Sequence, residues 1–138
     1  MTKPKDFEWI EFFKLADSYT YSNSQAKIRT GISRFYYSAF CKSRNYINSH
    51  ELYLDNRSEK IMTSKKVDVH AETSKIFRNH EKFCNDCSGV IISKNLDKLR
   101  KMRNQADYDN VINRPLDKMI QESKKRSKRI FELLNQLN

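Results

Sequence analysis

Apolar residues recur at helical spacing along most of the chain. At about 100° per residue, one segment places Ile28, Ile32, Phe35, Ala39 and Tyr46 on a single face. A face this wide is typical of a central, largely buried helix. Residues 50–66 show weak periodicity and predict a loop that could hold one helical turn. The pattern predicts five helices. The first covers residues 5–17, with Pro4 at its start, and the second runs from just after the polar cluster 22–24 to about residue 49. The third covers residues 67–83, the fourth runs from near residue 93 to past residue 108, and the fifth runs from residue 115 to the C-terminus.

Two positions interrupt these apolar faces. Gly31 lies inside the second helix, where a glycine costs about 1 kcal/mol relative to alanine. A close crossing of two helices would explain it. Ser123 and Ser127 occupy the apolar stripe of the last helix and leave a polar gap in it.

The composition supports an all-α fold and a single domain over residues 1–138. A chain of 138 residues can build one hydrophobic core. Only 2 glycines and 2 prolines are present, whereas β-sandwiches, Rossmann folds and P-loop folds need many tight turns. The composition therefore disfavours those folds.

The net charge of +10, from 27 Lys and Arg against 17 Asp and Glu, suggests an anionic partner, of which nucleic acid is the most common. Five cations lie in the six residues of the basic run, 124–129. One interpretation is a surface that binds phosphates without sequence specificity, and the other is a solvated helix face. The residues concerned are Lys124, Lys125, Arg126, Lys128 and Arg129.

The chain lacks a stretch long enough to cross a membrane and a signal-peptide core, so we expect no membrane association. Three cysteines, an odd number, fit a reducing cytoplasm better than a disulfide framework. His80, Cys84 and Cys87 have a spacing similar to that of zinc ligands, with His70 upstream, but a second tight ligand pair is missing. The sequence therefore predicts no metal site and no cofactor.

The fourth predicted helix carries a polar stripe beside its apolar face. Arg103 and Asp107 are four residues apart, which predicts an ion pair within the helix. Asn104 and Tyr108 are also four apart and share a face, and Arg100 lies on the same side as Asp107. These residues form either a phosphate site or a structural seam between helices or subunits. Arg29 lies within the aromatic arc of the second helix, so it is either packed on a ring or directed into a cleft.

At these segments the chain resembles the HEPN domains (higher eukaryotes and prokaryotes nucleotide-binding). Residues 29–40 (RTGISRFYYSAF) are similar to the "R…SRxYYAxF" helix of small prokaryotic HEPN proteins, and residues 99–108 (LRKMRNQADY) to their "L…RxxADY" helix. Val69, His70 and Phe77 follow in the expected order between them. The resemblance spans about residues 7–135.

The resemblance implies an up-and-down bundle of about five helices that forms a two-fold dimer. Many members are metal-independent ribonucleases of toxin–antitoxin, abortive-infection or CRISPR systems. Their signature is an arginine, often followed by asparagine, and a histidine separated from the arginine by four to six residues. Arg103 and Asn104 match its beginning, but Tyr108 stands at the histidine position, and no histidine follows His80.

This departure changes the chemistry that the helix can perform. Histidine has a pKa near 6.5 and suits proton transfer, whereas tyrosine, with a pKa of about 10, is a poor base at neutral pH. Tyr108 could still donate a hydrogen bond, and Asp107 could serve as a base only if its pKa rose, which the two flanking arginines oppose. His70, on another helix, is the remaining candidate base.

The leading hypothesis is an RNA-binding protein of HEPN type and, in its stronger form, a ribonuclease acting as a toxin or antiviral defence effector. Whether the chain is an enzyme stays open. The alternatives are a catalytically silent module that partners a nucleotidyltransferase, a cognate antitoxin or another defence protein, and a nucleotide-binding protein. The candidate catalytic residues are Arg103, Asn104, Asp107, Tyr108 and His70, and the candidate nucleic-acid contacts are Arg29, Arg100, Lys124, Lys125, Arg126, Lys128 and Arg129.

Overall fold

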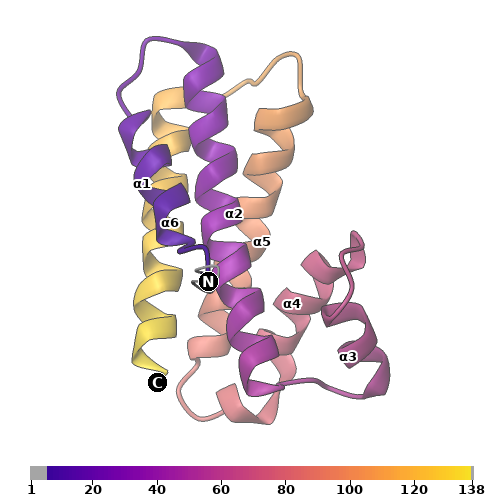
Figure 1. Ribbon diagram of the computed structural model, residues 1–138. Helices are drawn as coiled ribbons and strands as arrows, with labels where there is room; N and C mark the ends of the chain where they lie inside the picture. The colour runs from indigo at the N-terminus through magenta and orange to yellow at the C-terminus, as the bar shows by residue number, and fades with distance from the viewer. Residues whose placement is uncertain (1–5, 138) are drawn as a thin grey trace, which may run out of the picture.

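The computed structural model describes residues 6–137, and within that range the regular structure is helical, with no strand. The predicted all-α fold is therefore confirmed. Helices α1, α2, α5 and α6 run alongside one another, while α3 and α4 lie to one side near the lower end of α2 (Figure 1). The helices are α1 (Ile10–Ser18), α2 (Gln25–His50), α3 (Asn56–Met62), α4 (Asp68–Asn79), α5 (Ser88–Tyr108) and α6 (Leu116–Gln136), with a 3₁₀ turn at Glu81–Phe83.

Helix α2 is the central element, because it packs against α1, α4, α5 and α6. Ser24 caps its first turn by accepting a hydrogen bond from the Lys27 amide, and Glu51 ends it in the left-handed conformation, with φ of 52°. Both ends match the predicted bounds within about one residue. The apolar face reaches the core, where Ile32, Phe35 and Ala39 are fully buried.

Gly31 marks a close helix crossing, as its position suggested. A Cβ atom placed there would lie 2.7 Å from Cδ1 of Ile120 on α6 and 3.3 Å from the carbonyl oxygen of Ala16 on α1. The two serines in the polar gap of α6 are also hydrogen-bonded, Ser127 across the core and Ser123 within its own helix. Ser127 donates a 2.9 Å hydrogen bond to the Phe35 carbonyl, and Ser123 donates one of the same length to the Met119 carbonyl.

Besides the start of α5, three boundaries differ from the sequence-based expectation. Residues 50–66 contain α3, a two-turn helix that Asp55 caps by accepting a 2.7 Å hydrogen bond from the Ser58 amide. Helix α4 ends at Asn79 because His80 adopts an extended backbone, and the 3₁₀ turn then follows separately. The first helix begins at Ile10, and its expected start at Pro4 lies outside the described residues.

Helix α5 begins at Ser88, five residues before its expected start near Ser93. Asp86 accepts hydrogen bonds from the amide and the hydroxyl of Ser88, and Cys87 adopts a left-handed conformation with φ of 61°. Gly89 then brings the first turn against α4, because a Cβ atom there would lie only 2.0 Å from the Phe77 carbonyl oxygen. Residues 85–89, which are rich in turn-forming residue types, thus lead directly into the helix.

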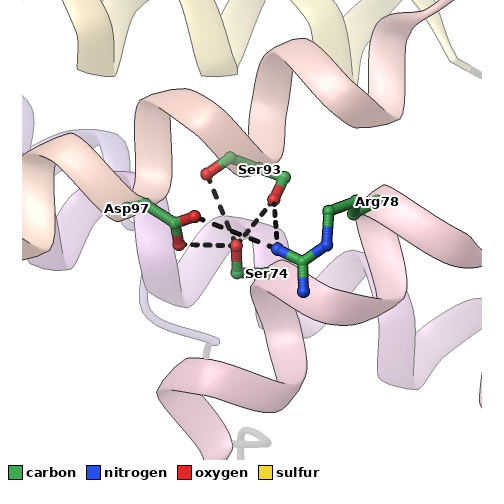
Figure 2. A network of polar contacts seen from close by, with 4 residues as sticks. All are labelled: Ser74, Arg78, Ser93 and Asp97. Atoms are coloured by element: carbon green, nitrogen blue, oxygen red, sulfur yellow. Dashed lines mark hydrogen bonds and ion pairs between the residues drawn. The ribbon is translucent and has the colours of Figure 1, made fainter.

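A hydrogen-bonded network joins α4 to α5 beside this contact (Figure 2). The Ser74 hydroxyl donates a 2.6 Å bond to the Asp97 carboxylate and lies 2.7 Å from the Ser93 hydroxyl. Arg78 reaches Ser93 at 3.4 Å and Asp97 at 4.0 Å. Because Ser74 and Ser93 are buried, these bonds satisfy polar groups that would otherwise destabilise the interface.

Candidate functional site

Arg103 is the most buried charged group of the predicted site. It lies on α5 next to the core residues Met102 and Ala106, and only 8% of it is exposed. Its Nη1 atom lies 3.8 Å from Oδ2 of Asp107, which confirms the predicted ion pair. Within the described residues 6–137, its buried Nε–H has no hydrogen-bond partner. A buried guanidinium normally uses its donors fully, so this cation is incompletely compensated.

Helix α2 supplies the groups that surround the guanidinium. The Cζ atom of Arg103 lies 5.6 Å from the ring centre of Tyr36 and 5.1 Å from that of Tyr37. Ser33 donates a 3.2 Å hydrogen bond to Asp107, so that carboxylate is held from both helices. Cation–π contacts and the ion pair orient Arg103 toward the junction of α2 and α5.

His70 lies on α4 at the other side of Tyr36. The Tyr36 hydroxyl is 2.5 Å from Nδ1 of His70, and the imidazole stacks on Phe40 with ring centres 4.2 Å apart. Burial, together with the positive charges of Arg100, Arg103 and Arg44, lowers the pKa of His70 to about 4. Burial also raises the pKa of Tyr36. At neutral pH the imidazole is therefore neutral and the phenol keeps its proton.

The structure brings together only part of the predicted catalytic set. Arg103 and His70 both contact Tyr36 and Tyr37, and Asp107 joins them through its ion pair with Arg103. Asn104 is exposed on α5, and Tyr108 is 74% exposed at the last residue of that helix. Within residues 6–137, neither side chain forms a hydrogen bond with the cluster, which consists of Arg103, Asp107, His70, Tyr36 and Tyr37. Arg100 is half-buried and close enough to His70 to lower its pKa.

Arg29 binds the backbone at the C-terminal end of α5 rather than an aromatic ring. Its guanidinium donates hydrogen bonds to the carbonyl oxygens of Ala106 (3.2 Å), Asp109 (2.6 Å) and Asn110 (3.5 Å), and Nε bonds to Gln25. These carbonyls lack intrahelical partners, and a cation at this end also complements the helix dipole. This contact is neither of the two environments expected for Arg29, which were packing on an aromatic ring and direction into a cleft.

The basic run is divided by its ion pairs. Lys124 pairs with Asp17 of α1 at 2.7 Å, Arg126 lies 3.7 Å from Glu122, and Arg129 lies 3.8 Å from Glu132. Lys125 and Lys128 form no ion pair within the described range. Part of the charge in this run therefore stabilises the bundle surface and is compensated.

A groove of about 590 Å³ runs between α5 and α6 beside the basic run. Arg126 crosses it, because Nη1 donates a 2.9 Å hydrogen bond to Asn95 on α5. Two acids, Glu122 and Glu132, share the walls with the cations. The remaining lining residues are Ile91, Lys125, Lys128 and Arg129.

His80, Cys84 and Cys87 do not converge. His80 accepts a hydrogen bond from the Lys82 amide, and both cysteines are exposed. The part of the chain that the structure describes contains no group of three His, Cys, Asp or Glu side chains placed to hold a metal ion. Within the same residues, no helix combines the length and apolarity needed to cross a membrane.

Sequence reasoning missed the α2 contribution to the cluster, since it assigned Tyr36 to the apolar face and did not consider Arg44. One signal was available: Tyr37 and Arg44 are seven residues apart and therefore share a helix face.

Comparisons with protein-family models, curated proteins and solved structures gave no match to this chain.

Proposed function

We propose that this chain is an RNA-binding protein of HEPN type and that the cluster around Arg103 contacts RNA phosphate. The buried guanidinium carries the proposal, because within residues 6–137 its Nε–H has no partner and its carboxylate partner stands 3.8 Å away. Since the Nε atom is buried, an RNA phosphate would supply the missing acceptor after the Arg103 side chain turns outward. A planar guanidinium suits that role, since it can hold two phosphate oxygens at once.

The groove between α5 and α6 supports the same function with a second contact area. Lys125 and Lys128 line it and have no acidic partner within residues 6–137. Backbone phosphates bind such lysines without regard to sequence, and counterion release makes the binding sensitive to salt.

The stronger form of the proposal is a metal-independent ribonuclease that acts as a toxin or a defence effector, as the resemblance implies. Arg103 and Arg100 would offset charge on the phosphate at the point of cleavage. His70 would take the proton of the attacking 2′-hydroxyl, the bond from phosphorus to the 5′-oxygen would break, and Tyr108 would donate a hydrogen bond or a proton to that leaving oxygen. A base with a pKa of about 4 is weak at neutral pH, so bound phosphate must raise this pKa for the imidazole to act.

A second candidate, a catalytically silent interaction module, is favoured by the contacts of the cluster itself. Asp107, Ser33 and the two tyrosine rings hold Arg103 at the α2–α5 junction as a structural seam would. Under this alternative, the chain pairs with itself or with a protein such as a nucleotidyltransferase or an antitoxin, using surface such as the exposed Tyr108 and Val111.

Measurements of RNA binding and RNA cleavage by the Arg103→Ala variant distinguish the RNA-binding proposal from the interaction module. The matched control is Arg114→Ala, which removes one partly exposed arginine from the α5–α6 connection. We expect Arg103→Ala to weaken binding of a labelled single-stranded RNA about tenfold and to abolish any cleavage of total RNA, while Arg114→Ala behaves like the wild type. A folded Arg103→Ala protein with wild-type affinity would favour the interaction module.

A further inference from the structure

Uncompensated positive charge gathers on a part of the surface that the basic run does not include. Arg57 and Lys60 lie on α3, Lys65 and Lys66 follow it, and Arg44 projects from α2. Within residues 6–137 none of these five cations forms an ion pair, whereas three of the five in the basic run do. Asp68 is the acid that shares a hollow with Arg57, Lys60 and Lys66.

Three of these cations surround a second hollow, the His70 pocket, with a volume of about 330 Å³. The buried Phe40 forms part of its wall, with His70 stacked on that ring. The Arg44 guanidinium lies 5.8 Å from the Phe40 ring centre. The lining residues are Tyr37, Phe40, Cys41, Arg44, Lys65, Lys66, Val67, Val69 and His70, none of them acidic.

We propose that the His70 pocket binds a phosphate group of an RNA strand, with Arg44, Lys65 and Lys66 as its cationic contacts and His70 as a hydrogen-bonding partner. The identity of the ligand as RNA rests on the proposed function, but the affinity for phosphate rests on the pocket alone. Its volume is near the lower limit of small-molecule sites, which suits one nucleotide unit better than a large ligand.

The electrostatics of His70 support this assignment. Arg44 on α2 and Arg100 and Arg103 on α5 act on the imidazole together and, with burial, lower its pKa. Lys65 and Lys66 add to the positive field in the same hollow, while the neighbouring Tyr36 stays neutral. A bound phosphate offsets that field, so phosphate binding raises the pKa of His70.

A matched pair of double variants distinguishes the His70 pocket from the basic run. Lys65→Gln/Lys66→Gln and Lys124→Gln/Lys125→Gln each remove two charges. In NMR titrations near neutral pH, we expect inorganic phosphate to shift the His70 ring signals and the Lys66 amide. The first variant should weaken this binding about tenfold or more, since it removes two charge-assisted hydrogen bonds, and the second should leave it unchanged.

A titration with a single-stranded oligoadenylate distinguishes the two proposals. If RNA shifts the same signals and the Lys65→Gln/Lys66→Gln protein binds it more weakly than the wild type does, the pocket belongs to the RNA path. If phosphate binds at His70 but RNA binds nowhere, the RNA-binding proposal fails while the phosphate pocket stands. If phosphate leaves the His70 signals unmoved, or moves them equally in both variants, the pocket proposal is wrong.

Discussion

The hydroxyl of Tyr36 and Nδ1 of His70 lie 2.5 Å apart and join α2 to α4 through side chains 34 residues apart in the sequence. Arg103 of α5 also contacts this tyrosine, with its Cζ atom 5.6 Å from the ring centre. Tyr36 thus links the incompletely compensated arginine to the half-buried imidazole. The candidate site depends on this three-helix junction rather than on a motif within one helix.

The low pKa of His70 predicts that the protein loses stability as pH falls from about 6.5 to about 4. Below pH 6.5 the histidine of the unfolded chain takes up a proton before the folded one does, so protonation favours unfolding. Urea midpoints at pH 7, 5.5 and 4.5 measure this loss. His70→Gln, which cannot titrate, should show a smaller loss over the same interval. Equal losses in the two proteins would mean that His70 is not held neutral by the fold.

Gly89→Ala should destabilise the protein far more than Gly31→Ala. At Gly89 the added methyl meets the Phe77 carbonyl oxygen at 2.0 Å and Cβ of Phe83 at 2.5 Å, and backbone must move to admit it. At Gly31 the nearest atom is the end of the flexible Ile120 side chain. We expect a loss of about 3 kcal/mol for Gly89→Ala and less than about 1 kcal/mol for Gly31→Ala, because overpacking is partly offset there by helix propensity. Thermal unfolding of the two variants ranks them, and the reverse ranking would contradict the packing at α4 and α5.

Arg29→Gln should lower stability by about 1–2 kcal/mol, because the carbonyls of Ala106 and Asp109 lose their donors. Lys27→Gln, an exposed position on the same turn of α2, is the control and should be nearly neutral. Chemical denaturation measures both. A silent Arg29→Gln substitution would show that water replaces the guanidinium at the end of α5 without cost.

The basic run should contribute to RNA binding mainly through its unpaired lysines. Lys125→Gln/Lys128→Gln and Lys124→Gln/Arg129→Gln remove the same charge, but the second pair is already engaged with Asp17 and Glu132. We expect the first variant to reduce the slope of log Kd against log salt by about 0.7 for each phosphate that is no longer neutralised, and the second to reduce it less. The measurement is RNA affinity over a range of salt concentrations. Equal slopes for the two variants would mean that the ion pairs do not restrain these side chains.

The sequence predicted a helix closely where a capping residue and an apolar face indicated the same element. Ser24 and the apolar face of α2 predicted that helix closely, whereas α3 depends on one cap, Asp55, within a segment of weak periodicity. The start of α5 lies earlier than its apolar pattern predicts, because turn-forming residue types at 85–89 lead directly into the helix. Helix periodicity carries no information on the extended backbone at His80, where α4 ends.

The site was predictable only within single helices. The Arg103–Asp107 pair follows from a spacing of four, and the structure contains it. The contact of Tyr36 with His70 joins distant segments, and the partners of Arg29 are backbone carbonyls, which have no residue-type signature. Lys65 and Lys66 become notable only when folding places them beside Arg44 and His70.

Binding of the wild-type protein to a labelled single-stranded RNA, measured between about 50 and about 200 mM salt, tests the central claim most directly. We predict binding at low salt that weakens linearly in log Kd against log salt, with a slope of about 2 or more if at least three phosphates are contacted. Absence of binding at about 50 mM salt, or an affinity that salt does not change, would contradict RNA binding by this chain.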